Sequence, residues 1–159
     1  MSCAYEKSLR RFTCGKSKPC GEGMSRRVFY SPTYKVIFKV ARPDGSDRQS
    51  RREWERYNEV EAQYRYLFPI LDAVEYEGKL VLVMPKCKCL TFHCEALTYW
   101  MKEELPHYIR NMAESNGYQI SEQNVADLAV IIAKYKLNDL HYRNMGIWNG
   151  NLVILDWAW

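Results

Sequence analysis

The stretch "NDLHYRNMGIWNGNLVILDW", residues 138–157, decides how the C-terminal part of the chain folds. It contains two largely apolar runs, "MGIW" and "NLVILD", on either side of Asn149-Gly150. An Asn-Gly pair between two such runs is the strongest short-range signal for a β-hairpin with a two-residue turn. The turn fixes the register of the two strands, so we expect Trp148 to face Asn151.

The open end of this hairpin carries polar side chains. The same register places Asn144 opposite Leu155, which makes Asn144 and Asp156 neighbours. Strict pleating would direct their side chains to opposite faces, so they converge only if the strand ends leave the pleat. Amide and carboxylate oxygens suit Mg²⁺, which combines one or two protein ligands with substrate phosphates. Asp139 adds a second carboxylate on the loop that leads into the same end.

Upstream of this stretch, the pattern of apolar residues predicts an α+β chain with the element order ββαββ. The helix in this order has one apolar stripe, formed by Trp54, Tyr57, Val60, Tyr64 and Leu67. The predicted elements are strands at 27–31 and 35–41, a helix at 51–67, and strands at 70–76 and 79–85 that meet in a turn at Glu77-Gly78.

Two more helices are predicted between the second hairpin and the last one. One lies near 95–104, ahead of Pro106, and the other follows Ser121, a plausible N-cap. The buried face of the second helix is expected to consist of Val125, Leu128, Ile132 and Tyr135.

Charge is distributed unevenly along the chain. Residues 1–52 hold 13 Lys and Arg against 4 Asp and Glu, a net charge of +9, whereas residues 53–159 hold 10 against 15, a net charge of −5. The basic half predicts an anionic partner, such as a nucleotide, a phosphorylated small molecule or nucleic acid. Nucleic acid is the least favoured of these, because the basic segment lacks the interleaved aromatic residues of a base-stacking surface.

Apolar runs and cysteines indicate the cellular compartment. No apolar run reaches the roughly 18 residues that a membrane-spanning helix needs, and the N-terminus lacks the apolar core of a signal peptide. We therefore expect a cytoplasmic protein without a membrane partner, whose six cysteines are most simply reduced thiols. Zinc binding by Cys14, Cys20, Cys87, Cys89 and Cys94 stays open, although their spacings contain no C-x-x-C pair.

The order Asp, four residues, Asn, short hairpin and Asp resembles the catalytic loop and metal-binding motif of the protein-kinase-like superfamily. Asp139, Asn144 and Asp156 supply this order, and "DLHYRN" with "ILDW" looks closer to small bacterial or bacteriophage Ser/Thr kinases and aminoglycoside-phosphotransferase-like enzymes than to eukaryotic kinases. The resemblance implies a minimal two-lobed kinase-like fold, with an N-lobe at 1–86 and a reduced helical C-lobe at 87–159. It also implies that Asp139 engages the acceptor hydroxyl, while Asn144 and Asp156 hold Mg²⁺ on the phosphates of ATP.

The first lobe carries further parts of this resemblance. Gly21 and Gly23 precede Val28, as in a phosphate-covering loop whose backbone N–H groups approach phosphate oxygens. Lys39 lies in the next strand, where alternation places it on one face with Ile37. That face would cover an adenine while the Lys39 ammonium reaches the phosphates.

Lys39 needs an acidic partner to hold it in place. The family's ion pair between a strand lysine and a helix glutamate implies Glu53, Glu55 or Glu59 as that partner. We favour Glu53, with Glu55 second, because Glu53 shares a helix face with the apolar Tyr57 and so points inward.

The segment "VMPKC", residues 83–87, contains Met84 and is expected to be the hinge whose backbone pairs with the adenine edge. The chain departs from the family pattern at Ile37, where kinases usually have a small Ala, and in lacking His-Arg before Asp139. Two further departures lie near its end. Trp157 stands where kinases have Phe, and only three residues follow Asp156. Recognition of the substrate is therefore expected to come from residues 87–120 or from a partner chain.

These features together predict an ATP- and Mg²⁺-dependent phosphotransferase, a minimal Ser/Thr kinase of bacterial or phage type that acts on a protein in the cytoplasm, or in the host cytoplasm if phage-encoded. One alternative is a non-catalytic, pseudokinase-like module that binds nucleotide or a host protein. Another is a small-molecule kinase with an acidic acceptor pocket in residues 90–120. A homodimer is a further possibility, since a second copy would cover apolar surface that a complete helical lobe normally buries.

Overall fold

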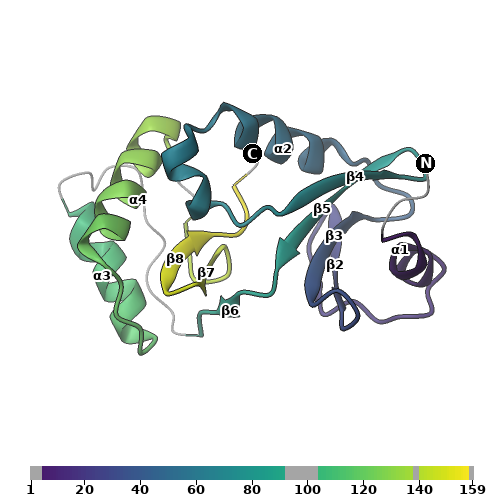
Figure 1. The fold of residues 1–159 in the computed structure, drawn as a ribbon, viewed down its shortest axis with the longest axis horizontal. Helices are drawn as coiled ribbons and strands as arrows, with labels where there is room; N and C mark the ends of the chain where they lie inside the picture. The colour runs from purple at the N-terminus through teal and green to yellow at the C-terminus, as the bar shows by residue number, and fades with distance from the viewer. Residues whose placement is uncertain (1–4, 92–103, 138–139, 158–159) are drawn as a thin grey trace. The chain divides into compact units, whose positions relative to one another are not determined.

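The computed structural model describes residues 5–91, 104–137 and 140–157 and has an α+β architecture (Figure 1). It contains a five-stranded antiparallel sheet, a three-stranded antiparallel sheet and several helices. The elements are α1 (Glu6–Thr13), β1 (Gly21–Glu22), β2 (Arg26–Ser31), β3 (Val36–Ala41), α2 (Arg48–Glu59), the 3₁₀ helix η1 (Ala62–Leu67), β4 (Asp72–Tyr76), β5 (Lys79–Pro85), β6 (Lys88–Cys89), α3 (Leu105–Ser115), α4 (Glu122–Tyr135), β7 (Met145–Trp148) and β8 (Asn151–Ile154).

The described residues form two compact units. Unit 1 contains those within 1–59 and 70–86, and unit 2 contains those within 60–69 and 87–157. Residues 60–69, which the sequence analysis placed in the first lobe, thus group with unit 2. Among the described helices, none has the length and apolar character needed to span a membrane.

The single helix predicted at 51–67 is wrong, because α2 ends at Glu59 and the 3₁₀ helix η1 follows it. The physical reason is a change of packing partner along the apolar stripe. The α2 side chains Trp54 and Tyr57 pack on the sheet of unit 1, whereas η1 packs against α4 and β8 of unit 2. The helix therefore ends where the packing partner of the stripe changes from one unit to the other.

The sheet of unit 1 has the strand order β1-β2-β3-β5-β4. Its two faces are covered by different helices. On one face, Leu9 and Phe12 of α1 pack on a cluster that includes Phe38 and Val83. On the other face, α2 packs on Leu80 and Leu82. Because neighbouring residues of β5 point to opposite faces, α1 and α2 lie on opposite sides of the sheet.

The sequence analysis did not predict α1. This helix spans eight residues, and six of them, Glu6, Lys7, Ser8, Arg10, Arg11 and Thr13, are polar or charged. Only two apolar residues, three positions apart, face the sheet, which is too short a pattern to separate from a basic loop. The strand β1 escaped prediction for the same reason, since it has only two residues.

Both predicted hairpin turns are confirmed. Glu77 and Gly78 have φ values of 51° and 73°, and Asn149 and Gly150 have φ values of 50° and 76°. Positive φ at both central residues is the signature of a type I′ turn, which matches the twist of the flanking strands. The predicted register of the last hairpin is also present, with Trp148 paired to Asn151.

Unit 2 combines the sheet β6-β7-β8 with α3, α4 and η1. The predicted N-cap is confirmed, since the Ser121 hydroxyl accepts a hydrogen bond from the backbone N–H of Asn124 at 3.1 Å. The predicted buried face of α4 holds except at Tyr135, which is half-buried. The described helix before it begins at Leu105 with proline in its first turn, where proline is tolerated. The helix predicted at 95–104 lies outside the described residues apart from its last position.

Candidate functional site

A buried ion pair joins β3 to α2 in unit 1. The ammonium nitrogen Nζ of Lys39 lies 2.8 Å from Oε1 of Glu53, and the two residues are 7% and 1% exposed. The pairing that the sequence analysis favoured is therefore present. The other two candidates, Glu55 and Glu59, are exposed.

Arg26 is a second cation on the same carboxylate. Its Nη1 lies 2.5 Å from Oε2 of Glu53, and Arg26 is 4% exposed. With one cation on each oxygen, the carboxylate is fixed in orientation by two charge-assisted hydrogen bonds. The sequence analysis missed Arg26, although a signal was there: Arg26 alternates with Val28 along β2 and so shares the face of Lys39.

Cross-strand pairing brings the predicted nucleotide-binding residues of unit 1 onto this face. Gly21 pairs with Val28, and Val28 pairs with Lys39, so these three lie in one row across three strands. Ile37 pairs with Met84 in the next row. Directly paired residues point to the same side of an antiparallel sheet. Val28 and Ile37 are half-buried and Met84 is buried, so an apolar surface adjoins the Lys39 ammonium.

Gly23 lies in the turn between β1 and β2. Its N–H donates to the carbonyl of Arg26 at 2.9 Å, and its own carbonyl accepts from the guanidinium of Arg42 at 2.9 and 3.2 Å. Neither Gly21 nor Gly23 has a positive φ, and an added Cβ would meet only ordinary contacts, at 3.5 and 3.8 Å. The backbone conformation therefore does not demand glycine at these positions. The remaining reason to expect glycine at these two positions is that it leaves room for a ligand to approach the backbone closely.

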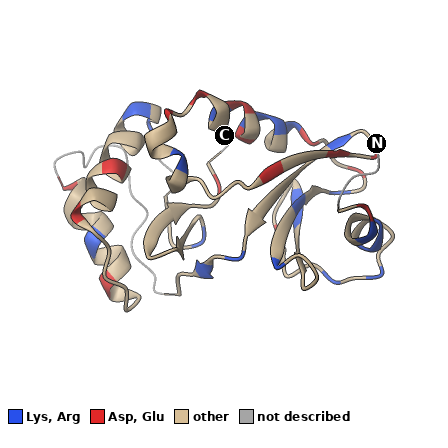
Figure 2. Cartoon of the chain, viewed as in Figure 1, with Lys and Arg blue, Asp and Glu red and all other residues tan. Residues whose placement is uncertain are grey.

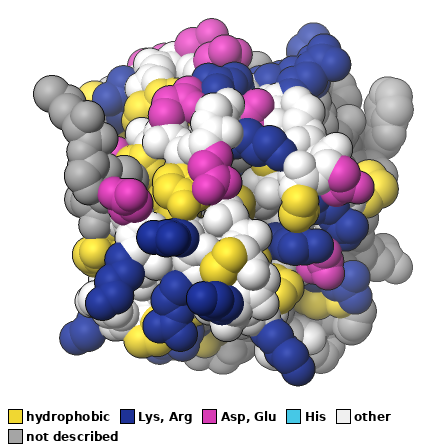
Figure 3. Space-filling view, turned by 90° about the vertical axis from the view of Figure 1, so that its right-hand side faces the viewer, with side chains coloured by type: hydrophobic (Ala, Val, Ile, Leu, Met, Phe, Trp, Pro, Cys, Tyr) yellow, Lys and Arg dark blue, Asp and Glu magenta, His cyan; other side chains and the backbone are white. Residues whose placement is uncertain are grey.

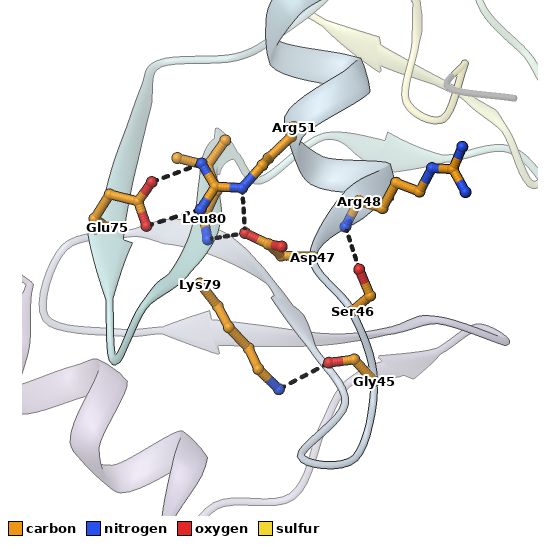
Figure 4. A network of polar contacts seen from close by, with 8 residues as sticks. All are labelled: Gly45, Ser46, Asp47, Arg48, Arg51, Glu75, Lys79 and Leu80. Atoms are coloured by element: carbon orange, nitrogen blue, oxygen red, sulfur yellow. Dashed lines mark hydrogen bonds and ion pairs between the residues drawn. The ribbon is translucent and has the colours of Figure 1, made fainter.

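A network of polar contacts fixes the N-terminal end of α2 (Figure 4). The Asp47 carboxylate oxygen Oδ2 accepts from the backbone N–H of Leu80 at 2.7 Å and pairs with Nε of Arg51 at 2.8 Å. Arg51 also pairs with Glu75 at 2.8 Å, and this hydrogen bond raises the pKa of the Arg51 guanidinium. These contacts connect α2 to the β4–β5 hairpin and so fix the position of α2 in which Glu53 contacts Lys39.

The loop before α2 is held by Lys79 in the same region (Figure 4). Its ammonium donates to the carbonyls of Arg42, Pro43 and Gly45 at 3.0, 2.9 and 2.8 Å. The Lys79 ammonium thus donates hydrogen bonds to three carbonyls of an irregular segment, in which regular backbone N–H donors are lacking. The network is structural, and its effect on the site acts through the position of α2.

In unit 2, the open end of the β7–β8 hairpin has the predicted arrangement of its backbone. The carbonyl of Asn144 accepts from the N–H of Leu155 at 2.7 Å, which places Asn144 opposite Leu155. The strand β8 ends at Ile154 and the chain bends at Leu155, so the pleat stops before Asp156. This is the departure from regular alternation that a shared metal site of Asn144 and Asp156 requires. Both residues are half-buried.

Trp157 anchors the residue that precedes it. Its side chain is 1% exposed and stacks on Phe68, with ring centroids 4.0 Å apart, while Tyr135 meets its edge at 6.0 Å. Asp156 is thus held between a backbone hydrogen bond at Leu155 and a buried aromatic side chain. The sequence motif could not show this packing, because Phe68 and Trp157 are far apart in the chain.

A second residue missed by the sequence analysis, Asn124, fastens α4 to β8. Its side-chain amide donates to the carbonyl of Leu152 at 3.1 Å and accepts from the N–H of Leu152 at 2.9 Å, and Asn124 is 0% exposed. Nearby, the Tyr66 hydroxyl donates to Asp127 at 2.7 Å and joins η1 to α4. Burial, followed by this hydrogen bond, raises the pKa of Tyr66 to about 12.

Asp139, the predicted catalytic carboxylate, lies outside the described residues. Its described neighbours Leu137 and Leu140 are buried, and the carbonyl of Leu140 accepts from the Tyr108 hydroxyl at 3.3 Å. His141 accepts a hydrogen bond from the backbone N–H of Arg143 at 3.1 Å through its ring nitrogen Nδ1, as expected for a side chain that stabilises its own loop.

Within 5–91, 104–137 and 140–157, no three or more His, Cys, Asp and Glu side chains group as a metal site. A magnesium site made of Asn144, Asp156 and substrate phosphates would need fewer such side chains, so the magnesium site stays a prediction. Of the cysteines considered for zinc, Cys94 lies outside the described residues.

Comparison with known proteins adds no assignment. No protein-family model matches the chain, and no curated protein matches it.

Proposed function

We propose that the protein is an ATP- and Mg²⁺-dependent phosphotransferase of the protein-kinase-like type, with a protein Ser/Thr hydroxyl as its acceptor. The observation that carries the proposal is the buried Lys39–Glu53 ion pair, which lies on one sheet face beside Val28 and Ile37. A lysine has no structural need to be buried between apolar strands, because burial of its charge is costly even when it is paired. A requirement for a fixed ammonium at a phosphate accounts for its presence.

In this proposal each residue has a definite role. Lys39 contacts the phosphates of ATP, and Glu53 is a positioning residue that holds the Lys39 ammonium. Asn144 and Asp156 coordinate Mg²⁺ through hard oxygen ligands, and Asp139 orients the acceptor hydroxyl. Phosphoryl transfer depends mainly on positioning and on stabilisation of charge, so a small scaffold is sufficient for it.

The first test measures binding of a fluorescent ATP analogue in the presence and absence of Mg²⁺. We expect saturable binding to the wild type and a loss of more than about tenfold in affinity for Lys39→Met, since the phosphates lose a fixed cation. The matched control is Lys35→Met, which removes an exposed lysine four positions away. Asp156→Asn should bind the analogue with little dependence on Mg²⁺. Equal affinities for Lys39→Met and Lys35→Met would contradict the proposal.

The second test measures transfer from labelled ATP to a mixture of acceptor proteins. The wild type should transfer label, and Asp139→Asn should bind nucleotide with normal affinity while transfer falls by about a hundredfold or more, as for loss of a group that positions the nucleophile. Urea denaturation of each variant shows whether it remains folded.

A nucleotide-binding module without transfer activity is the second candidate. The packing of Trp157 favours it. In kinases, Phe-Gly follows the metal-binding Asp and gives that segment mobility, whereas here Trp157 is buried against Phe68 and Tyr135. Saturable binding of Mg·ATP to the wild type without any transfer would establish this candidate in place of the first.

A further inference from the structure

A cluster of exposed cations lies on the side of the unit 1 sheet that faces away from Lys39. The α1 helix packs on this side through Leu9 and Phe12, so the rest of its circumference points outward. Figure 2 marks the basic residues of α1 in blue on the ribbon, and Figure 3, which views the right-hand side of Figure 1, shows Lys and Arg gathered in its lower part. We call the exposed cations of this segment the α1 basic surface; they are Lys7, Arg10, Arg11, Lys16 and Lys18.

The cations of the α1 basic surface lack acidic partners within the described residues, as do Lys35, Arg48 and Arg52 elsewhere in unit 1. Within the described part of the chain, none of its five residues forms an ion pair. In contrast, Arg27 and Arg42 both pair with Glu22, at 3.2 and 3.3 Å, and Arg51 pairs with Glu75. Five exposed cations against one exposed carboxylate, Glu6, leave this segment with a net positive charge, and a bound anion relieves the repulsion among the cations.

A cavity of about 240 Å³ adjoins the C-terminal end of α1. Its walls include the apolar side chains of Phe12, Phe29, Val40 and Val81, and Thr13 lies at the end of the helix. Small-molecule sites usually measure about 300–1,000 Å³. A smaller apolar cavity suits one side chain of a larger partner, which is how anchor residues bind at protein interfaces.

The charged residues that line the cavity are already engaged. Arg27 pairs with Glu22, and the Lys79 ammonium donates to three backbone carbonyls. Glu77 also lines the cavity. An acidic group would therefore find cations without acidic partners at the α1 basic surface, whereas Arg27 and Lys79 in the cavity wall already have partners. The arrangement selects a ligand with an apolar group in the cavity and carboxylates outside it.

We propose that the α1 basic surface and this cavity together bind an acidic segment of a partner protein, with one apolar side chain of the segment inserted in the cavity. Single-stranded nucleic acid fits less well, because bases need open aromatic faces. Phe12 and Phe29 stack on each other, with centroids 4.7 Å apart, so their facing sides are closed to a base. A membrane surface also fits less well, since no large apolar side chain within the described residues of α1 is exposed.

The test is fluorescence anisotropy with a short labelled peptide in which one Phe is flanked by Asp and Glu. The same peptide with Ala in place of Phe is the matched probe. We expect the Phe peptide to bind more than about tenfold more tightly than the Ala peptide, as for the loss of an anchor side chain. Binding of both should weaken with salt, because the carboxylates contact exposed cations.

Two variants separate the two parts of the surface. Arg10→Ser with Arg11→Ser should weaken both peptides by about tenfold or more and reduce the salt dependence. The matched control, Arg48→Ser with Arg52→Ser, removes the same charge from exposed positions of α2 and should change affinity less than about twofold. Thr13→Trp places a large side chain in the lining of the cavity. The affinity of this variant for the Phe peptide should therefore fall to its affinity for the Ala peptide.

Several results would overturn the proposal, provided that urea midpoints show the variants to be folded. Equal affinities for the Phe and Ala peptides would show that the cavity does not bind an apolar side chain of the peptide. Equal losses for the α1 and α2 double variants would show attraction by net charge alone. Absence of peptide binding would show that the surface does not bind an acidic segment. Tighter binding of a single-stranded RNA or of anionic lipid vesicles than of the Phe peptide would show that the surface binds nucleic acid or membrane instead. None of these outcomes depends on the proposed phosphotransfer.

Discussion

Substitution of Glu53 gives the sharpest test of the candidate site, because this single carboxylate compensates two buried cations. Glu53→Gln keeps the size of the side chain but removes its charge, so the buried Arg26 and Lys39 both lose their ion pair with this carboxylate. Removal of one partner from a buried ion pair costs about 3–5 kcal/mol. We expect a loss of this size in the free energy of unfolding. It is a large part of the roughly 5–15 kcal/mol that stabilises a typical domain.

Urea denaturation measures the loss, with Glu55→Gln as the control on the exposed face of the same helix. The control should change stability by less than about 0.5 kcal/mol. A triple variant, Arg26→Met with Lys39→Met and Glu53→Met, should recover most of the loss, since apolar replacement of a buried ionic group is often neutral or stabilising. A loss below about 1 kcal/mol for Glu53→Gln, or a triple variant less stable than the single one, would refute the assignment of a shared buried carboxylate.

Three further predictions concern unit 2. Asn124→Ala should lower the unfolding free energy by about 2–4 kcal/mol, because it leaves the buried N–H and C=O of Leu152 without partners; urea denaturation measures this. Gly146→Ala should cost about 1–3 kcal/mol in the same assay, since the new Cβ would lie 3.0 Å from the Lys88 carbonyl oxygen, and an unchanged urea midpoint would show that β6 moves freely. Tyr66 has a raised pKa of about 12, so its protonated hydroxyl stabilises the fold below pH about 10 and this contribution disappears between pH about 10 and 12. The stability difference between wild type and Tyr66→Phe should shrink over that range, and a difference that does not change with pH would contradict the shift.

The two hairpins are the clearest features of this fold that short stretches of sequence determine. Both type I′ turns lie at the predicted dipeptides, and the register of β7 and β8 follows from the turn alone. The face of β3 that carries Lys39 follows from alternation, and the N-cap at Ser121 follows from one hydroxyl before an apolar pattern. Each of these features depends on residues next to one another in the chain, whose backbone preferences are local.

The candidate site was predictable only in part, for the same reason. Strand alternation and an amphipathic helix were enough to place Glu53 near Lys39, although the glutamates of α2 differ only in the direction that each faces. Strand alternation could have placed Arg26 on the face of Lys39 but could not show that Arg26 is buried, since a basic residue at the start of a strand is usually solvated. Its burial depends on how α2 lies on the sheet, and the Asp47 and Lys79 contacts decide that position.

By itself, the sequence determined the two hairpin turns, the register of β7 and β8, and the face of β3 on which Lys39 lies. Tertiary packing alone decided that the predicted helix at 51–67 divides after Glu59, that Arg26 reaches Glu53 from 27 positions away, and that Asn124 bonds Leu152 from 28 positions away. The physical reason is that turns and pleats follow from local backbone energetics. The partner of a buried polar group, in contrast, depends on which distant surfaces are brought together when apolar faces pack.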